Sequence, residues 1–138
     1  MNYYLADSNA FSAYLRGKSP NLTAKMQAAI AVGELRLSIM VLSELEFGAR
    51  KAVRTLGTTH FVERLEQLKQ AFTVDPIGLG FETSYALVRD TLEAQGQKIG
   101  DRDIIIAAHA LSLGAIVVSR NMGEFSRVPG LKVENWEN

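Results

Sequence analysis

The sequence predicts a three-layer α/β/α protein, in which helices cover both faces of a central parallel β-sheet of about five strands. Short apolar runs alternate with helical patterns from one end of the chain to the other, which is typical of such a sheet. No repeat, low-complexity tract or linker interrupts this alternation. The chain has 138 residues, 47% of them hydrophobic, so we expect a single domain, residues 1–138, with one core.

The first quarter of the chain contains one predicted strand and two predicted helices. The apolar run at residues 3–6 indicates a strand, and a short helix follows at residues 8–16. Pro20 suits the first turn of the second helix, because the N–H that proline lacks would be unpaired there in any case. This helix has one apolar face and ends near Gly33.

The middle of the chain begins with a second apolar run, residues 35–38, which we interpret as a strand. A helix with an apolar stripe follows over about residues 40–53. Gly57 separates it from the next helix, residues 59–72, in which apolar side chains recur at helical spacing.

The last part of the chain is predicted to contain three strands and two helices. A short strand at about residues 73–75 precedes a helix at about residues 80–95, which has one aromatic and aliphatic face. The next helix, residues 101–113, is apolar nearly all round, which predicts that it is buried. Residues 115–118 indicate a buried strand, and residues 131–134 a weaker final one.

Composition narrows the possible functions. Cysteine is absent, which excludes disulfide frameworks, thiolate metal sites and cysteine nucleophiles, and which suits a cytoplasmic protein. Lys plus Arg and Asp plus Glu both number 15, so nucleic acid would have to be attracted by local basic patches and not by the overall charge. No apolar run reaches the roughly 18–20 residues that span a bilayer, so no membrane association is expected.

Three carboxylates lie where predicted strands give way to helices. Asp7 follows the first strand, Glu44 lies one turn into the helix after the second, and Asp103 begins the buried helix. The carboxyl ends of parallel strands share one edge of a sheet, and ligands bind there in open α/β folds. Acids gathered at that edge would repel one another unless a divalent cation such as Mg²⁺, which prefers oxygen ligands, neutralised them. The pattern therefore favours metal-assisted phosphoryl chemistry.

Each acid also has a purely structural interpretation. Asp7 can cap the helix that follows it, since a side-chain oxygen there accepts an orphan N–H. Glu44 and Glu46 lie at opposite margins of the apolar stripe of their helix, and periodicity does not choose between them. Asp101 and Asp103 point about 200° apart on their helix, so we expect one of them in the pocket and the other as a cap.

One amide and three other residues complete the set of candidates. Asn121 follows the strand at 115–118, so it is expected either at the same sheet edge as Asp7 or in a turn. Its amide oxygen can bind a metal or a water but brings no charge. His60 and His109 are expected in surface or core positions and not in catalysis, and Trp136 is expected to anchor the C-terminal segment to the body.

Six short motifs occur in order along the chain: Leu5-Ala6-Asp7-Ser8-Asn9, Ser43-Glu44-Leu45-Glu46-Phe47-Gly48-Ala49, Gly100-Asp101-Arg102-Asp103-Ile104-Ile105-Ile106-Ala107-Ala108-His109-Ala110, Val117-Val118-Ser119-Arg120-Asn121, Glu124-Phe125 and Leu131-Lys132-Val133-Glu134-Asn135-Trp136. In order and spacing they resemble a PIN domain and, more narrowly, the VapC toxins of type II toxin–antitoxin modules. The resemblance covers essentially the whole chain.

The resemblance implies an endoribonuclease that depends on Mg²⁺, with Mn²⁺ as a substitute. It places the family's catalytic positions on Asp7, Glu44, Asp103 and Asn121, and it favours Glu44 over Glu46. Asp7 and Asp103 would be the principal metal ligands, and Glu44 would complete the acidic cluster. The fourth position is Asp in many members, so Asn121 gives this site one charge fewer.

The resemblance also implies partners. Toxins of this family form homodimers and are held inactive by a VapB-type antitoxin, whose C-terminal segment lies in a groove near the active site; the complex binds operator DNA. Phe47 and the helix at residues 59–72 are the candidates for that groove. RNA would be the substrate, and Lys98, Arg102 and Arg120 are the cations expected to contact it. Initiator tRNA, cut in the anticodon loop, is the first expectation for this substrate, and ribosomal RNA is the alternative.

Two other classes of function compete with this interpretation. A non-catalytic PIN-like subunit of a DNA-binding repressor complex would retain the acids only as caps. A phosphate-handling switch or phosphatase fits less well, because Asp7 is a single acid and Asn9 interrupts the Asp-x-Asp pattern that such a phosphatase uses.

Overall fold

The computed structural model describes residues 2–137 and contains five strands and seven helices within that range. The strands are β1 (Tyr3–Ala6), β2 (Leu35–Ser38), β3 (Val74–Asp75), β4 (Ala115–Val118) and β5 (Val133–Glu134). The helices are α1 (Ser8–Arg16), α2 (Pro20–Ala31), α3 (Ile39–Leu56), α4 (His60–Ala71), α5 (Phe81–Ala94), α6 (Asp101–Leu113) and α7 (Met122–Phe125).

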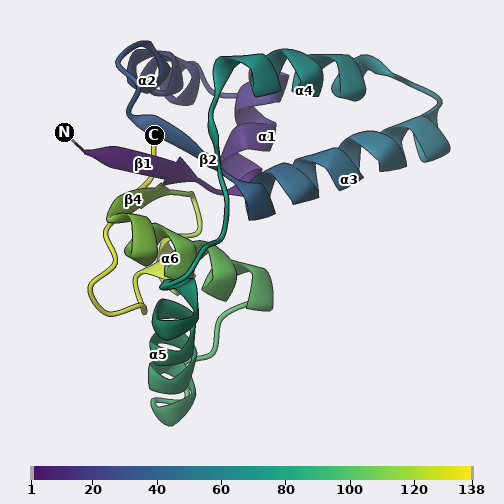
Figure 1. Cartoon of the computed structure of the whole chain (residues 1–138). Coiled ribbons are helices and arrows are strands. Elements are labelled where there is room, and N and C mark those ends of the chain that lie inside the picture. Colours follow the sequence, from purple (N-terminus) through teal and green to yellow (C-terminus); the bar gives the residue numbers. More distant parts are fainter. Residues whose placement is uncertain (1, 138) are drawn as a thin grey trace.

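The strands form one sheet in the order β3-β2-β1-β4-β5, and every neighbouring pair is parallel. Helices α1, α2 and α4 lie on one side of the strands, and α5 and α6 lie on the other (Figure 1). The predicted three-layer α/β/α architecture with a parallel sheet is therefore confirmed. No helix in the described residues is both long and apolar enough to cross a membrane.

The core lies on both faces of the central strands. Leu5, Leu37 and Val117 are completely buried, as expected for parallel strands that are covered on both sides. Helix α6 is buried along most of its length, which confirms the prediction from its apolar surface. Trp136 packs against the ring of Tyr4 with 5.0 Å between centroids and fixes the C-terminal segment to β1, as expected.

The elements differ from the predictions in several places, among them β5, which begins at Val133 and not at residue 131. Helix α3 continues to Leu56, beyond the expected end near residue 53, because its last turn is exposed and carries no apolar stripe by which to recognise it. Gly57 ends it, with a positive φ of 67° that suits glycine. Helix α7 was not predicted, since a helix of four residues is too short to show a period.

The parallel register of β1 and β4 aligns the carboxyl ends of these two strands. Ala6 is paired with Val118, and the backbone N–H of Asp7 donates to the carbonyl of Val118 at 3.0 Å. The residues that follow these strands, Asp7 and Ser119, are therefore neighbours at the carboxyl edge of the sheet. The site described below is built at this edge.

Candidate active site

Asp7 lies at the junction of β1 and α1 and is almost fully buried, with 5% of its surface exposed. Its Oδ1 accepts the backbone N–H of Ala10 at 2.8 Å, which confirms the predicted cap of α1. Its Oδ2 accepts the hydroxyl of Ser119 at 2.6 Å. Burial raises the pKa of Asp7, although the hydrogen bonds from Ser119 and Ala10 oppose the shift. Each carboxylate oxygen retains a lone pair, so capping does not prevent Asp7 from binding a cation or a water.

Asp103 lies in the first turn of α6 and is half-buried. Its Oδ2 accepts the side-chain N–H of Asn121 at 3.1 Å. Burial, then the nearby Glu124, and then the charge of Asp7 raise the pKa of Asp103 to about 6, against the effect of the Asn121 hydrogen bond. The effect of the Asp7 charge on the pKa of Asp103 indicates that the two carboxylates lie in one electrostatic environment.

Asp101 does not behave as predicted. Asp101 and Asp103 were expected to exclude one another from a single pocket, with one of them as a cap. Instead, both border the same cleft of about 410 Å³, and the N-cap of α6 is Gly100, with no side-chain hydrogen bond to the helix. The cleft faces the end of α6, and at a helix end side chains from different sides reach the same space. Asp101 is exposed there, while Asp103 is held by Asn121.

Glu44 and Glu46 differ in the residues that they contact on other helices. Glu46 forms an ion pair with Lys69 of α4, so it joins α3 to α4. Glu44 borders the cleft with Asp7 and Asp103, and its Oε2 lies 3.5 Å from the guanidinium of Arg102. Periodicity left these two glutamates equal, and the tertiary contacts place Glu44 at the cleft.

Asn121 lies between two carboxylates. Its side-chain nitrogen donates to Asp103 and also to Glu124, and its backbone N–H donates to Ser119 Oγ at 2.8 Å. Because Ser119 in turn donates to Asp7, a chain of hydrogen bonds links Asn121 to both aspartates. The amide therefore holds the acids with its NH₂ group, whereas the sequence suggested a role for its oxygen.

Glu124 was missed as a site residue. It lies in α7 beside Asn121, which lowers the pKa of Glu124, and it contributes to the raised pKa of Asp103. Its position three residues after Asn121 would have placed both side chains on one face of a helix, but the short α7 itself was not predicted. The structure thus adds a carboxylate beside Asp103 and Asn121.

The donor set suits a hard divalent cation bound by few protein ligands. All the charged groups are carboxylates, and the raised pKa values of Asp7 and Asp103 mean that a cation there would relieve an electrostatic cost. No three acidic or histidine side chains in residues 2–137 converge closely enough to form a complete metal cage. Mg²⁺ usually retains several waters and binds through one or two carboxylates, so this arrangement fits that ion.

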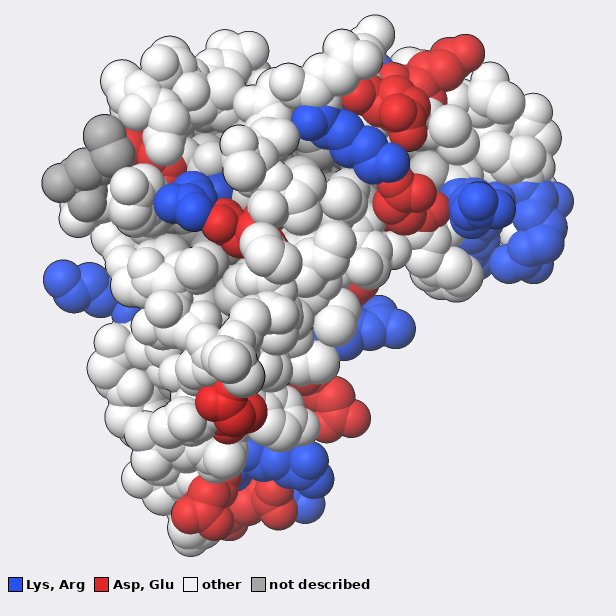
Figure 2. All heavy atoms as spheres, viewed as in Figure 1, with Lys and Arg blue, Asp and Glu red and all other residues white. Residues whose placement is uncertain are grey.

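The three cations predicted to contact RNA differ in position. Arg102 borders the cleft and is 76% exposed. Arg120 is exposed and lies near enough to Asp7 to lower its pKa, although it is not part of the cleft lining. Lys98 is exposed and also outside that lining, and its carbonyl accepts from Arg127. On the face seen in Figure 2, positive and negative groups are interspersed, in agreement with the balanced charge.

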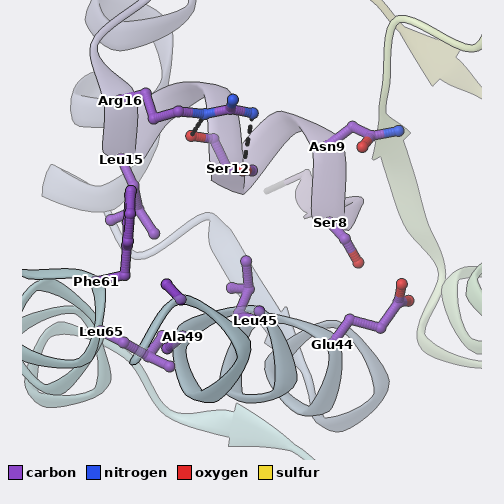
Figure 3. Close-up of a pocket in the computed structure, with 12 residues that line it drawn as sticks. Ser8, Asn9, Ser12, Leu15, Arg16, Glu44, Leu45, Ala49, Phe61 and Leu65 are labelled. Atoms are coloured by element: carbon purple, nitrogen blue, oxygen red, sulfur yellow. Dashed lines mark hydrogen bonds between the residues drawn. The ribbon is translucent and has the colours of Figure 1, made fainter. Parts of the chain in front are cut away.

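A second groove of about 320 Å³ adjoins the acidic cleft, between α1, α3 and α4. Ser8, Asn9 and Glu44 line both spaces. Figure 3 shows Glu44 and Ser8 at one end of the groove and Phe61 and Leu65 at the other. Phe47, which the sequence suggested for this groove, lies outside its lining and is 60% exposed. Helix α4 thus borders this groove and Phe47 does not, and the role of both in binding the antitoxin stays a prediction.

Comparisons with known proteins agree with this geometry. Residues 4–131 match the family described as PIN domain. The chain is 30% identical over 137 residues to "Ribonuclease VapC2" of Haemophilus influenzae, covering 96% of this chain and 97% of that protein. It is 28% identical over 141 residues to "tRNA(fMet)-specific endonuclease VapC" of Salmonella typhimurium, with coverage of 96% and 97%.

A solved structure has the same fold. A chain in the crystal structure of VapBC2 from Rickettsia felis, bound to a DNA fragment from the promoter, superposes with a TM-score of 0.86 at 25% identity. The superposition covers 97% of this chain and 98% of that one.

Proposed function

The chain belongs to the PIN domain family and, within it, to the VapC ribonucleases, and from this premise we propose that it is a Mg²⁺-dependent endoribonuclease toxin neutralised by a VapB-type antitoxin. The observation that carries the proposal is the meeting of Asp7 and Asp103 at one cleft. Their separation along the chain and the effect of the Asp7 charge on the pKa of Asp103 are unexpected for two independent helix caps.

In this proposal Asp7 and Asp103 hold the cation, directly or through its waters. A divalent cation supplies a water of lowered pKa and stabilises negative charge on a phosphate. Mn²⁺ would substitute for Mg²⁺. Glu44, which faces the same cleft, orients the attacking water, and Asn121 and Glu124 fix the position of Asp103.

RNA reaches this acidic cleft through flanking cations. Arg102 is the best placed of them, because it is exposed at the rim and its pairing with Glu44 is long and weak. Arg120 and Lys98 would contact the strand further from the acids. The contribution of each depends on salt, because each phosphate contact releases counterions.

Initiator tRNA, cleaved in its anticodon loop, is the proposed substrate. The support is the specificity of the Salmonella typhimurium relative, a tRNA(fMet)-specific endonuclease that aligns over nearly its whole length. Ribosomal RNA is the alternative. Sequencing of cleaved RNA ends from cells that express the protein separates the two, since the first predicts one cut in one tRNA and the second predicts cuts in ribosomal RNA.

The groove between α1, α3 and α4 is the proposed site for the antitoxin's C-terminal segment. Its apolar end, with Leu15, Phe61 and Leu65, would bind aliphatic or aromatic side chains, and Glu44 at the other end would attract a cation. The proposal includes cytoplasmic location, a homodimer, and binding of operator DNA only through the antitoxin complex. The Rickettsia felis VapBC2 complex, which is bound to a DNA fragment from its promoter, supports the contact with DNA. Leu79 and Leu87, both strongly exposed, support the presence of a protein contact near α5.

The decisive experiment compares RNA cleavage by the purified protein with and without Mg²⁺, using wild type and Asp103→Asn. Metal-dependent cleavage that the variant lacks is the expected result. A folded wild-type protein that binds antitoxin and operator DNA but never cleaves RNA would instead favour the non-catalytic repressor subunit.

A further inference from the structure

A buried polar pair lies in the core between α3 and α6. The Ser38 hydroxyl is 2.8 Å from Nδ1 of His109, and the two residues are 0% and 1% exposed. Ser38 Oγ also accepts the backbone N–H of Met40 at 3.1 Å and so caps α3. Burial of polar groups is costly even when they are paired, and an apolar pair of similar volume would fill this space at least as well.

The contacts favour the tautomer of His109 with the hydrogen on Nε2. The Ser38 hydroxyl has no other acceptor among the described residues, so it donates to Nδ1 and leaves the ring hydrogen on Nε2. Nε2 makes no hydrogen bond of normal geometry within residues 2–137. Burial lowers the pKa of His109, and the nearby carbonyl of Pro76 opposes the shift without reversing it. The ring is therefore a neutral, oriented acceptor for Ser38.

The pair is not a second catalytic centre. A serine, a histidine and an acid, Asp75, occur in one neighbourhood, but Asp75 is held by a hydrogen bond of 2.8 Å from Arg36. Neither Ser38 nor His109 borders the acidic cleft or the groove beside it, so no substrate reaches them there. The function of the pair must be exerted through the elements that it joins.

Those elements are the two helices that carry acids of the site. Ser38 precedes Glu44 by six positions, and His109 follows Asp103 by six. The hydrogen bond thus joins the N-cap of α3, which is the last residue of β2, to α6, and each partner lies about 9 Å along the helix axis from its acid. Within residues 2–137, the other polar link between these helices is the exposed contact between Arg102 and Glu44.

We propose that Ser38 and His109 are positioning residues that set the separation of Glu44 and Asp103 across the cleft, and thereby the affinity of the site for a divalent cation. The inference rests on the proposed metal-dependent function. An apolar pair would fill the space without a directional constraint on the register of α3 and α6, because the hydrophobic effect is non-directional. A hydrogen bond of 2.8 Å fixes their register.

The test measures Mn²⁺ binding to the purified protein by calorimetry, thermal unfolding without metal, and RNA cleavage as a function of Mn²⁺ concentration. The variants are His109→Leu, which keeps volume and removes the acceptor, and His109→Asn, whose short amide can again pair with Ser38. Ser38→Ala and its double variant with His109→Leu complete a cycle. Val88→Ala, a buried truncation on α5, is the control for a general loss of stability.

Mn²⁺ affinity is expected to fall about tenfold in His109→Leu, as for other residues that orient metal ligands, and to stay within about twofold of wild type in His109→Asn. Excess Mn²⁺ restores cleavage by His109→Leu, and the double variant binds no more weakly than His109→Leu alone. Val88→Ala unfolds at a lower temperature but binds Mn²⁺ normally. Wild-type affinity in a folded His109→Leu, or an equal loss of affinity in Val88→Ala, overturns the inference and leaves the proposed function standing. A wild-type protein that neither binds Mn²⁺ nor cleaves RNA overturns both.

Discussion

Replacement of Asp7 by asparagine and, separately, by alanine distinguishes the two roles that this side chain combines. One carboxylate oxygen caps α1 and the other accepts from Ser119, and the same group is a proposed metal ligand. Asparagine keeps an acceptor for the Ala10 N–H but has no charge. Alanine removes the cap, the partner of Ser119 and the charge together.

The expected changes in stability follow from these contacts. Loss of an N-cap costs about 1 kcal/mol, and a buried hydroxyl left without its acceptor costs about 1–3 kcal/mol. Removal of a carboxylate whose pKa is raised by burial offsets part of this. We expect Asp7→Ala to lose about 1–2 kcal/mol, which lowers the unfolding midpoint by roughly 5 °C in a domain of this size. Asp7→Asn should stay within about 1 kcal/mol of wild type, because Asn caps as well as Asp.

Both variants should lose more than about 100-fold in Mg²⁺-dependent RNA cleavage, because neither presents a carboxylate to the cation. Calorimetric unfolding without metal and a cleavage assay on the same samples provide the two readouts. Cleavage retained by Asp7→Asn would refute the ligand assignment. An equal loss of stability in the two variants would show that the cap does not account for the stabilising contribution of Asp7.

Three further predictions concern the other charged groups. Since the pKa of Asp103 is about 6 and a bound cation requires the carboxylate, Mg²⁺ affinity measured by calorimetry should rise about tenfold from pH 5 to pH 7 and then level off; a flat profile would contradict this. The same raised pKa means that the contribution of this group to the stability of the metal-free fold is present at low pH and is lost as the pH rises through about 6. Glu124→Gln should reduce cleavage roughly tenfold or more, whereas Glu46→Gln, which affects only the pair with Lys69, should not, and equal activities would place Glu124 outside the site. Arg102→Ala should reduce the salt dependence of RNA binding by about one phosphate contact, while Arg89→Ala, whose pair with Glu93 lies on α5, should leave it unchanged.

The strands and the sheet edge could be predicted because parallel strands buried on both faces appear in the sequence as short apolar runs. Residues 3–6, 35–38 and 115–118 were correct to the residue for this reason. The acid at the cleft could not be chosen between Glu44 and Glu46 by period alone, since that choice depends on Lys69, a residue on another helix.

The role of Asn121 in the site could not be predicted from the sequence pattern either. Its amide donates to Asp103 and Glu124, and this geometry follows from α7, a helix too short to leave a periodic signal. The sequence also could not show that Asp101 and Asp103 border one cleft. Their angular spacing around the helix separates side chains in the middle of a helix, but at a helix end both side chains can reach the same space. Local pattern thus identified the elements, and long-range contacts determined which side chains act together.

The contact between Asp7 and Ser119 spans 112 positions of the chain, and it is made by strands at the centre of the sheet. A ribosome must therefore translate β4 before this contact can form. Until β4 emerges from the exit tunnel and inserts beside β1, a nascent polypeptide lacks the complete cleft. The segments that line the adjoining groove, α1, α3 and α4, are all synthesised before β4.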